Sequence, residues 1–198
     1  AAIAGDSARI LAGFEELDRL AKLESGALEL DEGIADFGPI VAGTARQLDT
    51  VLSHRSAGLA LAAPEGPCPV ALSRNDAELL AWRILATLAG AAAAGESLRV
   101  RLTHDGGKAR LEIDLPASLA SRTEIFDSAA PIQPQAVTSG MFGAGFALRL
   151  ARAEARAAGG ELLRQNDMLW LSLPAAHRRP RESNDNPVDY GGKFAETR

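Results

Sequence analysis

The chain is poor in cysteine, in aromatic residues and in long apolar runs, and each shortage excludes a class of protein. Only one of its 198 residues is a cysteine, Cys68, so neither an intramolecular disulfide nor a cysteine-built metal site can form. Aromatic side chains make up 5% of the residues, which means that the core must be mainly aliphatic. We expect Cys68, in a proline-flanked strand, to be a small buried hydrophobic residue.

Basic residues are also scarce: the chain has 21 Lys and Arg residues against 26 Asp and Glu residues, and its net charge is −5. Phosphate contacts need clustered Lys and Arg, so the composition argues against a nucleic-acid partner. No apolar run reaches the roughly 18–20 residues that span a bilayer, and the N-terminus does not resemble a signal peptide. We therefore expect a cytoplasmic chain. Its start at Ala1, without methionine, favours a fragment of a longer, membrane-attached protein.

The first strong pattern is an amphipathic helix over residues 7–24, whose apolar residues recur at i, i+3, i+4 and i+7. Asp6 or Ser7 is the expected N-cap, and Ser25-Gly26 ends the helix. Such a helix needs a partner for its apolar face, which comprises Ile10, Leu11, Phe14, Leu17, Leu20 and Ala21.

The patterns that follow predict alternating helices and strands. The central helix, opened by Ser73 or Asn75, is expected to bury Leu79, Leu80, Trp82, Ile84, Leu85 and Leu88. Residues 116–140 are expected to form a loop with one helical turn near 121–127. The other expected elements are a strand at 27–32, a helix from Asp36 to about Ser53, strands at 59–64 and 69–73, the central helix at 76–95, a hairpin of 98–104 and 108–115, a helix before Gly159-Gly160, and strands at 161–165 and 168–174.

This order of elements predicts an α+β fold in two layers, with one mixed sheet covered on one face by three helices. The polar tail at 176–198 has no apolar period, and we expect it to be disordered unless a contact orders it.

A glycine-rich stretch opens the last predicted helix, with glycines at Gly140, Gly143 and Gly145. Glycines at this place let the backbone approach a ligand closely, and the free N–H groups of a first helical turn favour an anion. The alternative is a flexible loop that leads into a helix with a glycine at its end.

The run GAGFAL, Gly143 to Leu148, followed by a helix, by AGGEL and by a closing strand, resembles the last nucleotide-binding box of sensor histidine kinases. In that family the box reads roughly GxGLGL; here Phe146 replaces the first Leu and Ala147 the third Gly. The segment Leu17 to Leu30 is similar to the junction between the second dimerisation helix and the ATPase domain. The order of elements over residues 7–175 resembles the ATPase domain shared by histidine kinases, gyrase-type ATPases and Hsp90 chaperones.

The resemblance implies three parts: a dimerisation helix at 1–26, a degenerate ATPase-like domain at 27–175, and the tail at 176–198. It also implies ATP and Mg²⁺ as cofactors. An active member needs an Asn on the central helix to bind Mg²⁺, an Asp after the strand that precedes the lid to bind adenine, and the glycine box for the phosphates.

The first two of these positions lack the required side chains. The Asn positions fall on Thr87 and Ala91, and strand alternation puts Leu115 at the Asp position, with Asp114 turned to the other face. We therefore expect weak or absent binding of ATP and Mg²⁺, with no catalytic residue and no metal ligand. The vestigial nucleotide positions would be Thr87, Ala91, Leu115, Gly140, Gly143, Gly145 and Phe146.

The hypothesis from sequence is a degenerate two-component signalling module that forms a homodimer through residues 7–24 and contacts a response-regulator receiver domain or another kinase. An active histidine kinase with divergent boxes, a histidine phosphotransferase whose phosphoacceptor helix is missing from this chain, and an unrelated interaction scaffold are the alternatives. We expect His54, His104 and His177 to be surface residues without a catalytic role.

Overall fold

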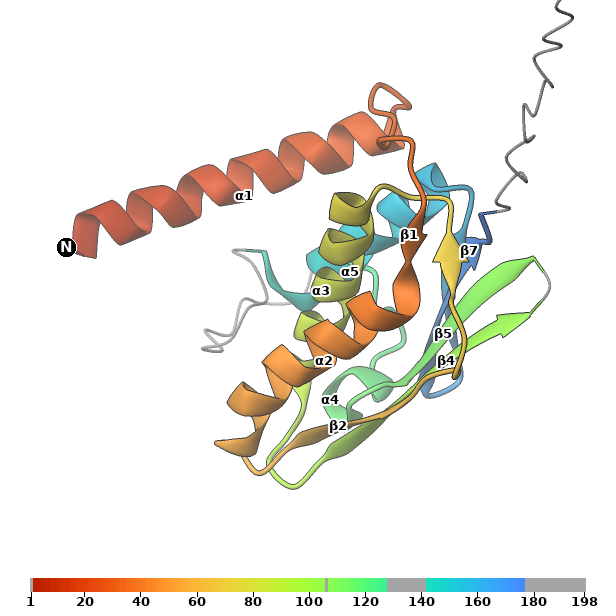
Figure 1. Cartoon of the computed structure of the whole chain (residues 1–198). Coiled ribbons are helices and arrows are strands. Elements are labelled where there is room, and N and C mark those ends of the chain that lie inside the picture. The colour runs from red at the N-terminus through yellow and green to blue at the C-terminus, as the bar shows by residue number, and fades with distance from the viewer. Residues whose placement is uncertain (1, 106, 128–141, 177–198) are drawn as a thin grey trace, which may run out of the picture.

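A five-stranded mixed sheet forms one layer of the molecule (Figure 1). The computed structural model describes residues 2–105, 107–127 and 142–176. The first two strands of the sheet pair in parallel and all other neighbours pair antiparallel. In spatial order the strands are β2 (Gly58–Ala62), β4 (Ser97–Asp105), β5 (Lys108–Asp114), β7 (Met168–Pro174) and β6 (Glu161–Gln165).

Three helices form the second layer and cover one face of this sheet: α2 (Phe37–Ser53), α3 (Arg74–Ala91) and α5 (Gly143–Ala157). Burial alternates along β4 and β5, because one side chain in two points into the aliphatic core and the next points to the uncovered face. The predicted α+β two-layer fold is confirmed. No helix in the described ranges is long and apolar enough to cross a membrane.

The start of α2 follows the sequence prediction closely. The carboxylate of Asp36 caps the helix by accepting hydrogen bonds from the backbone N–H groups of Gly38, at 3.3 Å, and Cys68, at 3.0 Å. A two-residue ladder of β1 (Ala35–Asp36) and β3 (Pro69–Val70) lies beside it. Cys68 is fully buried as expected, and burial raises the pKa of its thiol to about 11, so it is not a reactive thiolate.

The central helix α3 is capped by Ser73, but it ends at Ala91 and not at residue 95 as predicted. Two carbonyls at its C-terminal end, those of Gly90 and Ala92, accept hydrogen bonds from the guanidinium of Arg55, at 3.5 and 3.0 Å. A side chain from outside the helix thus replaces the hydrogen bonds that a longer helix would make. The predicted core residues Leu79 and Trp82 are instead exposed, on the face of α3 turned away from the sheet.

Two further local predictions were wrong. Residues 27–32 form no strand, since Asp31 donates its N–H to the carboxylate of Asp76 and accepts from the N–H of Ser73. The helical turn expected near 121–127 lies earlier, as α4 (Ala117–Ala120), directly after Pro116. Proline is common at the start of a helix because its fixed φ is close to the helical value.

The first helix, α1 (Ala2–Glu24), begins earlier than predicted, so Asp6 and Ser7 lie inside it and do not cap it. Its C-terminal part lies against α5, where Leu20 packs with Phe146 and Leu150. Its N-terminal part projects beyond the two layers in Figure 1. Exposed apolar side chains remain along it: Ile10, Leu11, Phe14 and Leu17.

Candidate functional site

The predicted nucleotide positions come from three segments: the C-terminal half of α3, the residue after β5 and the start of α5. Leu115 is buried in the main apolar core, and Ala91 packs against that core. Thr87 is almost completely buried within α3. Gly140 lies outside the described residues. The described positions are therefore in apolar surroundings, and their role in a nucleotide site stays a prediction.

The side chains at these positions offer little to a metal-bound nucleotide. Mg²⁺ prefers carboxylate, amide or phosphate oxygens in octahedral geometry. Ala91 has a methyl group, Leu115 an isobutyl group, and the hydroxyl of Thr87 is enclosed by the core with only 1% of the residue exposed. Within the described residues, no group of three or more His, Cys, Asp or Glu side chains could hold a metal ion.

The segment after β5 fills the space next to the end of α3 with its own side chains. Leu115, Leu119 and Ile125 are buried in the main core. The helical turn α4 is fixed there, because Ser118 Oγ donates to the carbonyl oxygen of Ala91 at 2.8 Å and Ala117 N–H donates to Glu96 at 2.8 Å. Leu115 stands where the resemblance places an adenine-binding Asp.

Asp114, which precedes Leu115 in the sequence, points to the opposite face of the sheet. It forms a bidentate ion pair with Arg99, at 2.7 and 3.3 Å, on the uncovered face. The alternation of strand β5 therefore turns this carboxylate away from the helices, as the sequence predicted.

The glycine box begins α5. Gly143 has a φ of +81°, which a residue with a side chain adopts only under strain, and α5 starts at this residue. The residue before it, Phe142, supplies no side-chain cap. Gly145 is buried, and Phe146 packs toward α1 with Leu20 and Leu150. Phe146 was predicted as a nucleotide-site position, but in the structure its ring is part of the contact between α1 and α5.

A buried ion cluster, which the sequence did not predict, joins α1 to α3 and α5. The carboxylate of Glu154 on α5 is only 2% exposed and accepts from Arg19 Nε at 2.7 Å and from Arg83 Nε at 3.1 Å. Arg83 also pairs with Glu16 at 2.6 Å, and Arg19 pairs with Asp76 at 3.2 Å. We call these five residues the Glu154 cluster. One sequence signal was available: Glu154 interrupts the apolar face of its helix, between Leu150 and Ala155.

The charges in the Glu154 cluster support one another. Burial acts to lower the pKa of Arg19, but the hydrogen bonds and charges of Glu154 and Asp76 outweigh it and raise that pKa above its ordinary value. Asp76 in turn accepts from Ser73 Oγ at 2.8 Å and from Asp31 N–H at 3.2 Å. The cluster therefore links α1, the segment after it and the start of α3.

Comparison with solved structures shows which fold this is. The histidine kinase AdeS of Acinetobacter baumannii superposes with a TM-score of 0.61 at 16% identity, over 87% of this chain and 82% of that one. The catalytic domain of histidine kinase ThkA superposes with a TM-score of 0.55 at 12% identity, over 74% of this chain and 98% of that domain. The chain has the fold of a histidine kinase catalytic domain.

The histidine kinase fold is also shared with full-length ShkA, solved in complex with AMPPNP, at a TM-score of 0.64 and 17% identity. The match covers 87% of this chain but only 37% of ShkA, so the chain spans about a third of that protein. No family model matches the sequence, and no curated protein matches it by sequence.

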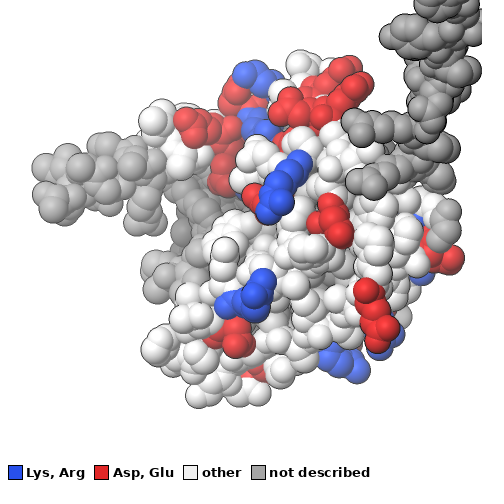
Figure 2. All heavy atoms as spheres, viewed as in Figure 1, with Lys and Arg blue, Asp and Glu red and all other residues white. Residues whose placement is uncertain are grey.

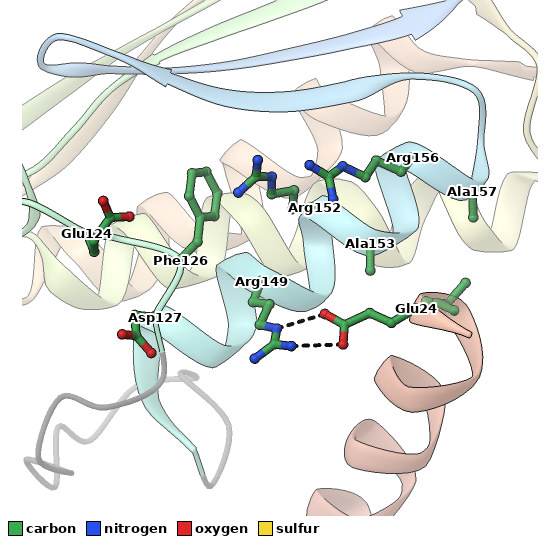
Figure 3. Close-up of a pocket in the computed structure, with 10 residues that line it drawn as sticks. Glu24, Glu124, Phe126, Asp127, Arg149, Arg152, Ala153, Arg156 and Ala157 are labelled. Carbon is green, nitrogen blue, oxygen red and sulfur yellow. Dashed lines mark hydrogen bonds and ion pairs between the residues drawn. The ribbon is translucent and has the colours of Figure 1, made fainter. Parts of the chain in front are cut away.

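Within the histidine kinase fold, the molecule also has a pocket on the outer flank of α5, of about 820 Å³. Figure 3 shows that it lies between the end of α1, the arginines of α5 and the segment that contains Phe126. It is lined by residues other than those predicted to contact a nucleotide.

Proposed function

We propose that the chain is a degenerate histidine-kinase-type module that binds ATP weakly or not at all and signals through protein contacts. The proposal is supported by the apolar character of the positions that the resemblance assigns to the nucleotide: Leu115 is buried in the main core and Ala91 packs against it. Phosphoryl transfer depends on positioning and on charge neutralisation by a metal. Buried leucines and an alanine can supply neither.

Dimerisation is the second part of the proposal. Ile10, Phe14, Leu17 and Ala21 follow one another at spacings of four, three and four residues, which is the spacing of a helix-bundle seam. All four are exposed, although Phe14 and Leu17 are large apolar residues. The residues that hold α1 on its own domain lie at 16, 19, 20 and 23, on another face of the helix. A second copy of the chain would cover the free stripe.

The partner of such a dimer is proposed to be a receiver domain of a response regulator or another kinase. Support comes from the shared fold with histidine kinases of two-component systems. The phosphotransferase alternative requires a phosphoacceptor His on a helix that this chain does not contain.

The nucleotide part is tested by calorimetric titration of the chain with ATP and with a non-hydrolysable analogue, each with and without Mg²⁺. We expect no saturable heat up to millimolar nucleotide, because the metal has no ligand at Thr87 or Ala91. Micromolar binding that strengthens with Mg²⁺ would contradict the proposal and favour an active kinase with divergent boxes.

A further inference from the structure

Helix α5 presents three arginines to the pocket on its outer flank. Arg149, Arg152 and Arg156 follow one another at spacings of three and four residues, which places them on one side of the helix (Figure 3). The pocket volume of about 820 Å³ falls within the range of small-molecule sites, roughly 300–1,000 Å³.

The first of these arginines is already neutralised. Arg149 makes two hydrogen bonds, both 2.8 Å, to the two carboxylate oxygens of Glu24 at the end of α1. The hydrogen bond from Arg149 lowers the pKa of Glu24, and Arg156 adds to this from farther away. The Arg149–Glu24 pair therefore forms one wall of the pocket and is not available to a ligand.

The other two arginines lack such a close ion pair. Neither Arg152 nor Arg156 forms an ion pair with any residue in the described ranges. The Nε of Arg152 is buried without a hydrogen-bond partner there, while its guanidinium lies 4.9 Å from the centre of the Phe126 ring. A buried donor without an acceptor is costly, and like charges one helical turn apart repel each other.

The lining holds as many carboxylates as arginines, but the remaining carboxylates come from a different segment than the arginines. Glu124 and Asp127 come from the segment after α4, and in Figure 3 the ring of Phe126 lies between Glu124 and Arg152. The pocket thus has a basic wall on α5, an aromatic face beside it and carboxylates at its rim.

We propose that this pocket binds the phosphate group of a small phosphorylated molecule, with Arg152 and Arg156 as the donors. A guanidinium offers five N–H donors in a planar fork that matches phosphate oxygens. One guanidinium suffices for a carboxylate, whereas two adjacent ones match the two charges and three free oxygens of a phosphate. The Glu124 carboxylate is placed to accept hydrogen bonds from hydroxyl or amino groups of the same ligand.

The site is separate from the vestigial nucleotide positions, so its test is independent of the proposed lack of Mg-ATP binding. Inorganic phosphate, pyrophosphate and AMP, all without Mg²⁺, would be titrated into the ¹⁵N-labelled chain at physiological salt. We expect saturable shifts of amide signals in residues 149–156 and 124–127. Tighter binding of AMP than of phosphate identifies an organic phosphate as the ligand; equal binding identifies phosphate itself.

The decisive variant is the double substitution Arg152→Gln and Arg156→Gln, which should weaken pyrophosphate binding at least about tenfold. The matched control is Arg99→Gln with Arg101→Gln, which removes the same charge from exposed positions on the far face of the sheet. Unchanged thermal midpoints would show that both variants fold.

Three results would overturn the phosphate site. The first is a wild-type chain that does not saturate with pyrophosphate at millimolar concentration. The second is a control variant that loses as much affinity as the pocket variant. The third is a set of amide shifts that cluster at residues 87–91 and 143–147. The last result would place the ligand at the nucleotide position and would count against the proposed function as well.

Discussion

At the scale of single residues, the most unusual feature is a carboxylate enclosed between two arginines. Glu154 is 2% exposed, and its two oxygens are held by Arg19 and Arg83. A buried charge is tolerated only when it is paired and hydrogen-bonded, so the three side chains stabilise the structure only as a set.

We predict that Glu154→Gln destabilises the chain by about 2–3 kcal/mol, because it leaves two guanidinium groups without their shared anion. The figure is below the usual cost of breaking a buried pair since Arg19 retains 27% side-chain exposure. Chemical denaturation measures the change. Glu161→Gln, the same substitution at an exposed position of β6, should change the free energy of unfolding by less than about 0.5 kcal/mol. Equal effects would contradict the role given to the Glu154 cluster.

At the scale of elements, α1 has two faces with different tasks. One face docks on the helix layer through Leu20 and the Glu154 cluster, and the other leaves large apolar side chains in solvent. Charged groups gather where α1 joins the rest of the molecule, as Figure 2 shows. The docked position of α1 leaves this apolar stripe exposed, and it is the surface proposed to bind a second copy.

We predict that Phe14→Asp converts a dimer to a monomer without loss of the fold, because the side chain is 62% exposed in the single chain. Sedimentation equilibrium gives the mass, and circular dichroism checks the helices. Ile34→Asp is the matched control, since Ile34 is an equally exposed apolar residue outside α1, at 58%. A wild-type chain that is monomeric at high concentration, or a control that also dissociates, would refute the dimer.

The same scale shows which elements the sequence could predict. The hairpin of β4 and β5, the final pair β6 and β7, and the helix after Gly143 follow from alternation, turn residues and helical periodicity, all of which are local. The segment at 27–32 was misassigned because its hydrogen-bond partners, Ser73 and Asp76, lie about 45 residues away. The end of α3 was missed because Arg55, from another segment, sets it.

The resemblance assigned Thr87, Ala91 and Leu115 to one nucleotide site, and that assignment stays a prediction. What the structure adds is their surroundings, because Leu115 is buried in the main core and Ala91 packs against it. Two features of these surroundings depend on tertiary packing. Ser118 and Glu96 fix α4 beside the end of α3, and Phe146 takes part in the contact with α1. No periodicity reports on such contacts.

At the scale of the whole molecule, the chain has the fold of a histidine kinase catalytic domain, and Leu115, Leu119 and Ile125 are buried in its core. Under the proposed function, these side chains stand in place of a bound nucleotide. If the proposed function holds, protein contacts carry the signal, and the free stripe on α1 and the arginines on the flank of α5 are the two surfaces proposed to make contacts.

Amide hydrogen exchange with and without millimolar Mg-ATP distinguishes a nucleotide position filled by the protein's own side chains from one that accepts a ligand. We predict slow exchange of the backbone amides of Leu119 and Ile125 in the free protein, and no change in residues 87–91, 115–125 or 143–147 when Mg-ATP is added. Fast exchange in the free protein, followed by protection of these three segments with Mg-ATP, would show a nucleotide site that opens and would contradict the account.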